Sequence, residues 1–235
     1  MGIPNLDAPS VIAIALKGGL ALTVARLLEI ASLVTPPRAS VAVGGGAALP
    51  DGGWRRHTDD LDLFARPAAA KRLVRAFRDL GMKTFWITEA HAVAWLDEDN
   101  ADAIARGESP TVRIDILSTV TEPEASAIRT AVPSKRLGVN LKVFRSDYLA
   151  AIKFLAGRPQ DLVDFDRLVQ AGVDVERVKY IVATADDTRT PALLARIEGA
   201  RKPFSGLRET GWLDEAALRE AWRANGPGAA VASAG

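Results

Sequence analysis

The chain has 235 residues, a net charge of +1 and no cysteine. Its length suits one large domain or two small ones, and its near-neutral charge excludes binding to nucleic acid through an overall basic field. Because it lacks cysteine, it has no disulfide, no thiolate metal site and no cysteine nucleophile, and we expect it in the cytoplasm.

The first apolar segment, residues 10–34, predicts a helix. Its apolar residues recur at helical spacing and would cover one face of a sheet; they include Leu20, Val24, Leu27 and Ala31. The segment also carries Lys17, Arg26 and Glu29. A charge at the centre of a membrane helix costs about 2.5–3.5 kcal/mol. We therefore expect a buried helix and no membrane contact.

The stretch from Gly44 to Asp62, GGGAALPDGGWRRHTDDLD, carries most of the candidate chemistry. A short strand at 40–43 leads into three glycines, a brief helix is expected at 47–49, and residues 60–64 predict a second strand. The period of two puts Asp60 and Asp62 on one face. Two neighbouring carboxylates raise each other's pKa, so we expect a divalent cation to neutralise them. The glycines allow close backbone approach and can direct N–H groups at an anion.

The middle of the chain predicts a helix from Pro67 to Gly81, one or two strands at 83–96 and a loop at 97–110. Exposed cations on that helix indicate a solvated face, with a ridge for RNA phosphates as the alternative; they are Lys71, Arg75 and Arg78. Residues 111–117 alternate, which separates Asp115 from the apolar side chains. Asp115 is either a third carboxylate of the site or an exposed surface residue.

The second half predicts mainly helices. These are at 122–131, 146–156, 159–172, 175–186, 191–200 and 213–224, with a strand at 138–143, Ser146 as a helix cap and a disordered tail at 226–235. We expect a catalytic domain at 1–140 and a helical domain at 141–225. His91 is expected to be structural, and Trp54 is a loop aromatic that could stack on a base.

Two blocks resemble a known group of proteins. After the glycine turn comes an Arg-x-Thr-x-Asp-x-Asp pattern ending at Asp62, and downstream lies a Lys-x-x-Ala-x-Arg-x-x-Asp-x-x-Asp pattern from Lys153 to Asp164. Together they resemble minimal nucleotidyltransferases of the DNA polymerase beta-like superfamily, nearest to abortive-infection toxins. The resemblance implies an α/β (α+β) fold, in which a mixed sheet flanked by helices precedes a helical C-terminal part.

The resemblance also implies residue roles. Asp60, Asp62 and Asp115 would bind Mg²⁺ or Mn²⁺, and Lys153 would contact the β- and γ-phosphates of an NTP. Further substrate contacts are expected from Gly44, Gly45, Gly46, Arg56, Thr58, Arg158 and Asp161. Arg56 either contacts the triphosphate or pairs with Asp59. For Asp161 and Asp164 with Arg158, a structural ion-pair cluster is the favoured interpretation, and a supporting catalytic role stays open.

The expected activity is metal-dependent transfer of a nucleotide from an NTP to an acceptor. The resemblance implies an RNA acceptor such as the 3′ end of a tRNA, and a toxin whose partner is an antitoxin protein. One alternative is a small-molecule nucleotidyltransferase of the antibiotic-modifying type. The other is a non-catalytic descendant that binds nucleotide or RNA, which the presence of Asp60, Asp62 and Lys153 disfavours.

Overall fold

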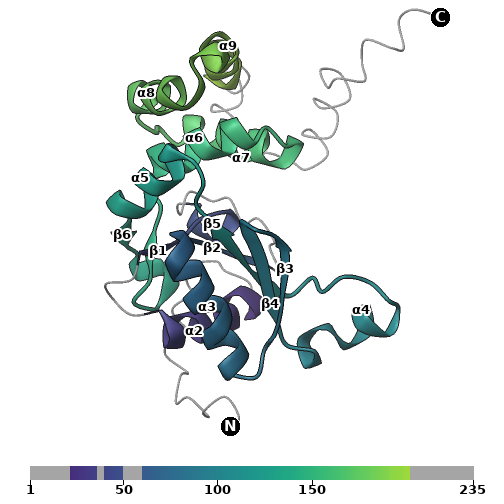
Figure 1. Cartoon of the computed structure of the whole chain (residues 1–235). Coiled ribbons are helices and arrows are strands. Elements are labelled where there is room, and N and C mark those ends of the chain that lie inside the picture. The colour runs from purple at the N-terminus through teal and green to yellow at the C-terminus, as the bar shows by residue number, and fades with distance from the viewer. Residues whose placement is uncertain (1–21, 36–39, 50–59, 202–235) are drawn as a thin grey trace, which may run out of the picture.

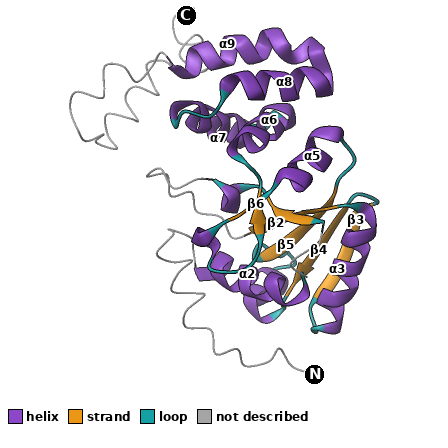
Figure 2. Ribbon diagram, turned by 90° about the vertical axis from the view of Figure 1, so that its left-hand side faces the viewer, coloured by secondary structure: helices purple, strands orange, loops and turns teal. Residues whose placement is uncertain are grey.

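The computed structural model describes residues 22–35, 40–49 and 60–201. These residues form a mixed sheet of seven strands flanked by helices, followed by a helical C-terminal part (Figures 1 and 2). This is the predicted α/β architecture. The strands are β1 (Val41–Val43), β2 (Asp60–Ala65), β3 (Lys83–Thr88), β4 (His91–Trp95), β5 (Arg113–Ser118), β6 (Val132–Pro133) and β7 (Lys142–Val143). The α-helices are α2 (Leu22–Val34), α3 (Pro67–Asp79), α4 (Ala101–Ala105), α5 (Glu122–Thr130), α6 (Ser146–Ala156), α7 (Pro159–Gln170), α8 (Val175–Asp186) and α9 (Thr190–Arg201).

The strand order in the sheet is β3-β4-β5-β2-β1-β7-β6. Strand β2 lies near the centre, parallel to β5 and antiparallel to β1. Strands β3, β4 and β5 form an antiparallel run, so residues 83–96 supply a hairpin of two strands. On the other side, β7 runs parallel to β1 and antiparallel to β6. This order places β2 and β5, the two strands that carry the candidate acids, side by side.

Helices α2 and α3 pack against one face of the sheet. That face is apolar because the strands alternate: Leu61 and Leu63 of β2 and Ile114 and Ile116 of β5 are fully buried in the core. The intervening residues of the same strands point to the opposite face. The alternation predicted for Asp115 is therefore confirmed, and the acids lie on the face away from α3.

Turn chemistry sets the ends of several helices as predicted. Helix α3 begins at Pro67, and Gly81, with φ of 91°, follows its end. The N–H groups of Gly81 and Met82 donate to the carbonyls of Arg78 and Phe77, which is the Schellman arrangement. In the same way Gly157 ends α6 in a left-handed conformation, and Pro159 opens α7.

Some local predictions were wrong. The expected loop at 97–110 contains a 3-10 turn and the short helix α4, which sequence pattern missed because α4 buries only Ala103. Only Lys142 and Val143 of the segment 138–143 pair as a strand, since Gly138 is left-handed after a 3-10 turn. Ser146, the predicted cap, is instead the first residue of α6, and Arg145 occupies the cap position. The brief helix expected at 47–49 is present, as a 3-10 helix at Gly46–Ala48. Residues 10–21, the helix expected at 213–224 and the tail lie outside the described residues.

The helical part joins the sheet directly. Phe144, two residues before α6, donates its N–H to Val43 of β1, and its ring packs on Phe64 of β2 with centroids 4.7 Å apart. Helices α6 to α9 then gather beyond one end of the strands (Figures 1 and 2). In the ranges 22–35, 40–49 and 60–201, no helix is long and apolar enough to cross a lipid bilayer.

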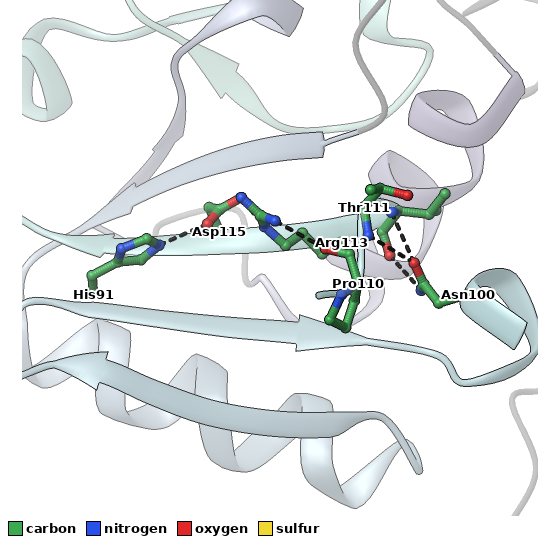
Figure 3. A network of polar contacts seen from close by, with 7 residues as sticks. His91, Asn100, Pro110, Thr111, Arg113 and Asp115 are labelled. Atoms are coloured by element: carbon green, nitrogen blue, oxygen red, sulfur yellow. Dashed lines mark hydrogen bonds and ion pairs between the residues drawn. The ribbon is translucent and has the colours of Figure 1, made fainter. Parts of the chain in front are cut away.

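A buried amide fixes the chain at the start of β5. Asn100 donates to the carbonyls of Leu96 and Val112 and accepts from the N–H groups of Thr111 and Val112. Figure 3 shows the side chain of Asn100 beside Thr111. All four contacts are 2.9–3.0 Å long. Asn100 therefore ties the segment after β4 to the strand that carries Asp115.

We expect Asn100→Ala to lower the free energy of unfolding by about 2–3 kcal/mol, because it leaves several buried backbone groups without partners. Urea denaturation followed by circular dichroism measures the change. Asn140→Ala, at an exposed position, is the control and should leave stability within about 0.5 kcal/mol of the wild type. Equal stabilities of the two variants would contradict the assigned role of Asn100.

Candidate active site

The structure brings the three predicted acids to one face of the sheet. Strands β2 and β5 pair in parallel register, and Asp62 lies opposite Asp115. Asp60 precedes Asp62 by two residues on the same strand and faces the same way, opposite Arg113. The pleat of two adjacent strands is thus enough to gather three carboxylates on one surface.

This crowding shows in the acidity of Asp62. The pKa of its carboxyl is raised from 3.8 to about 7. Burial is the largest cause, and the charges of Asp60 and Asp115 contribute to the same increase. The charges of Lys153 and Arg158 act in the opposite direction. Groups from β2, β5, α6 and the start of α7 therefore act on a single carboxyl.

The glycine turn lies directly against Asp62. Gly45 has a φ of 54°, and a Cβ added there would lie 1.6 Å from Oδ2 of Asp62. A Cβ on Gly44 would meet the Phe64 ring at 2.4 Å. The N–H of Gly44 donates to the carbonyl of Asp62 at 3.0 Å. This corrects one expectation, because that N–H holds the turn on β2 instead of facing an anion.

Both oxygens of Asp115 have partners. His91 Nε2 lies 2.6 Å from Oδ1, and Arg113 Nε donates to Oδ2 at 2.9 Å (Figure 3). The guanidinium also donates to the carbonyl of Pro110 at 2.9 Å, which fixes its orientation. Asp115 itself is only 4% exposed. The contact of His91 with Asp115 was not predicted from the sequence, because this contact depends on the pairing of β4 with β5.

Lys153 lies at the centre of a buried ion-pair cluster. Its Nζ is 3.0 Å from Asp161 Oδ1 and 2.8 Å from Asp164 Oδ2. Arg158 also contacts Asp161, while its side chain remains 78% exposed. The cluster of Arg158, Asp161 and Asp164 expected from the sequence is present, and Lys153 joins it. The two aspartates hold the ammonium group of Lys153 in a fixed place.

A cavity of about 270 Å³ joins these groups. Gly45, Asp62 and His91 line it from the sheet, and Lys153 and Arg158 line it from the helical part. Most of the remaining wall is apolar and includes Phe64, Leu117, Phe144, Leu149 and Ile152, while Ser118, Glu124 and Asp161 add polar groups. A second cavity, of about 500 Å³, is lined by residues of β6, α6 and α7 and the start of α8, and it includes neither Asp62 nor Lys153.

The donor set fits a magnesium ion that is shared with a substrate. Carboxylate oxygens are hard ligands, and Mg²⁺ commonly uses one or two of them together with waters and phosphate oxygens. Burial and the charges of Asp60 and Asp115 disfavour the ionised form of Asp62, and a bound cation would stabilise that form. In the described part of the chain no three His, Asp or Glu side chains are grouped so that they could hold a metal ion by themselves, so phosphate and water oxygens would have to complete the coordination. Mn²⁺ accepts the same oxygen ligands.

Three residues singled out from the sequence lie outside the described residues. They are Trp54, Arg56 and Thr58. Their expected contacts with a base, a triphosphate or Asp59 stay predictions.

We expect Asp62→Asn to stabilise the protein increasingly as pH rises from about 4 to 7. With its folded pKa raised, Asp62 holds a proton that the unfolded chain has released, so wild-type stability falls across this window. The amide carries no such penalty, and the difference should reach on the order of 4 kcal/mol at most. Urea denaturation in EDTA at several pH values measures it. A stability difference between Asp62→Asn and the wild type that does not change with pH would contradict the burial of the Asp62 carboxyl. Asp79→Asn, at an exposed position, is the control.

We expect Gly45→Ala to destabilise the fold more than Gly107→Ala. Both glycines have positive φ, and both variants bear a backbone cost; Gly45, with φ of 54° and ψ of −147°, lies close to a region that is essentially restricted to glycine, where the cost is on the order of 1–3 kcal/mol. Only Gly45 also has a side chain in the way, since no heavy atom lies within 4 Å of a Cβ at Gly107. Thermal melting compares the variants, and equal losses would show that the turn does not rest on Asp62.

Sequence comparison makes no assignment for this site. The chain matches no protein-family model and no curated protein. A function must therefore be argued from the side chains themselves.

Proposed function

We propose that the protein is a metal-dependent nucleotidyltransferase that moves a nucleotide from an NTP to an acceptor hydroxyl. One observation carries the proposal: a cavity is lined by Asp62 and by the cations Lys153 and Arg158, and Asp62 lies opposite Asp115 of the neighbouring strand. Acids that bind a cation and bases that bind phosphates are the groups this chemistry needs. The likeness to minimal nucleotidyltransferases, seen in the blocks ending at Asp62 and Asp164, supports the same conclusion.

The residues divide the work by charge. Asp60 and Asp62, with Asp115 on the next strand, would hold Mg²⁺ or Mn²⁺, and the bound ion would stabilise the triphosphate charge and make the acceptor hydroxyl more acidic. Lys153 is buried and held by Asp161 and Asp164, so its ammonium can meet phosphate oxygens without first being ordered. Exposed Arg158 can bind a phosphate in bidentate fashion at the rim.

The transfer itself breaks one bond and forms one. The acceptor oxygen attacks the α-phosphorus, the bond to the β-phosphate oxygen breaks, and pyrophosphate leaves. Asp115 is the proposed acceptor of the hydroxyl proton, since it is the acid beside Asp62 on the next strand. Positioning and charge stabilisation then supply most of the rate.

For the acceptor we propose an RNA 3′ hydroxyl, with tRNA as the first candidate, and a role as a toxin controlled by an antitoxin protein. The basic side chains of α3 do not bear on this choice. Lys71 and Arg75 are exposed and Arg78 bonds Thr84, but α3 covers the sheet face opposite the acids. The modest cavity of about 270 Å³ favours one alternative, a small hydroxylated molecule such as an antibiotic.

The test is transfer of label from each α-³²P-labelled NTP in the presence of Mg²⁺ or Mn²⁺. Total tRNA is the acceptor in one arm and a panel of hydroxylated antibiotics in the other. We expect label on RNA, and a loss on the order of a thousandfold in Asp62→Asn, since the ion supplies several kcal/mol to the transition state. Asp79→Asn is the matched control and should transfer at the wild-type rate.

Three other outcomes are informative. Label on an antibiotic alone would keep the enzyme class and replace the acceptor. Calorimetric binding of Mg-NTP that Asp62→Asn abolishes, without transfer to any acceptor, would indicate a binding protein. Equal transfer by the wild type and Asp62→Asn would refute the assigned site.

A further inference from the structure

We propose that His91 is a positioning residue that holds Asp115 as a metal ligand and proton acceptor of the site. The inference rests on the proposed function. His91 is far from the acids in sequence, and it meets Asp115 only because β4 pairs with β5. The short contact between His91 Nε2 and Asp115 Oδ1, 2.6 Å, is the observation that carries the proposal.

The chemistry of the contact defines what His91 does. An ionised carboxylate only accepts hydrogen bonds, so Nε2 is the nitrogen that carries the hydrogen. Arg113 donates to the other oxygen at 2.9 Å. Each oxygen of a carboxylate has two lone pairs. Within residues 22–35, 40–49 and 60–201, His91 and Arg113 each occupy one lone pair of a different Asp115 oxygen, and together they hold its rotamer from both sides.

His91 is itself fixed by the backbone. It begins β4 and lies opposite Leu117, and the residue before it, Ala90, accepts the N–H of Ser118 at 2.7 Å. The ring lines the same cavity as Asp62 and Lys153. His91 therefore lines the cavity and contacts Asp115, and such donors at strand ends are groups by which the outer shell orients metal-binding carboxylates.

Two substitutions separate positioning from other roles. In Gln the Nε2 donor stands the same number of bonds from Cα as Nε2 of His, whereas in Asn the donor is one bond nearer the backbone. His91→Gln should therefore keep the bond to Asp115, and His91→Asn should lose it. Neither side chain titrates near neutral pH, so rescue by Gln shows that the hydrogen bond, and not proton exchange, is what matters.

The experiment measures the affinity of the full-length protein for Mn²⁺ alone, from the electron paramagnetic resonance signal of the free ion. We expect His91→Ala and His91→Asn to bind Mn²⁺ about tenfold more weakly or worse, and His91→Gln to bind it as the wild type does. Trp95→Phe is the matched control on β4, because it removes a hydrogen bond to Asp97 without touching Asp115. It should bind Mn²⁺ normally.

Each remaining outcome decides the matter. Wild-type affinity in His91→Ala, equal weakness in His91→Gln and His91→Asn, or no Mn²⁺ binding by the wild type would overturn the proposal. If His91→Ala does not fold by circular dichroism, the Gln and Asn pair gives the answer. The nucleotide-transfer assay on the same proteins tests the proposed function separately. If the Mn²⁺ affinities of the variants follow the predicted order but no nucleotide is transferred, the proposed function is refuted and the role of His91 stands.

Discussion

The pairing of Asp62 with Asp115 is the constraint on which the rest of the site depends. Two like charges on adjacent strands repel, and enclosure within the protein strengthens the repulsion. The fold opposes this with cations at short range: Arg113 contacts Asp115 directly, and Lys153 and Arg158 lower the pKa of Asp62 without returning it to the ordinary value. The residual charge is a cost to stability, and such costs are typical of functional sites.

Sequence periodicity and turn chemistry predicted much of the fold. The alternation in residues 111–117 identified the face of Asp115, and Pro67, Gly81, Gly157 and Pro159 marked helix ends because their backbone preferences are local. The cluster around Asp161 was also within reach of sequence reasoning. Arg158, Asp161 and Asp164 are spaced three residues apart at the start of α7, so helix geometry places them close together, whereas Lys153 reaches them from α6 across the turn at Gly157.

Features that depend on strand pairing could not be predicted in this way. No local pattern states that β4 pairs with β5, so a histidine 24 residues from Asp115 looked structural. The same limit applies to the glycine turn, where the sequence indicated freedom of the backbone but not that the Gly44 N–H is used by Asp62. The charges of α3 were visible in the sequence, yet only the packing of that helix shows that they lie across the sheet from the acids.

The attachment of α6 has a consequence for how the chain can be divided. Phe144 donates its N–H to Val43 of β1, and its ring packs at a tilt against Phe64 of β2. The helix that follows, α6, carries Lys153. The electrostatics of Asp62 therefore span this junction, because two cations that lower its pKa, Lys153 and Arg158, come from the helical part. A fragment cut before α6 would keep the ion pair of Arg113 with Asp115 but would lose Lys153 and Arg158, so the sheet alone would not reproduce the charge balance around Asp62.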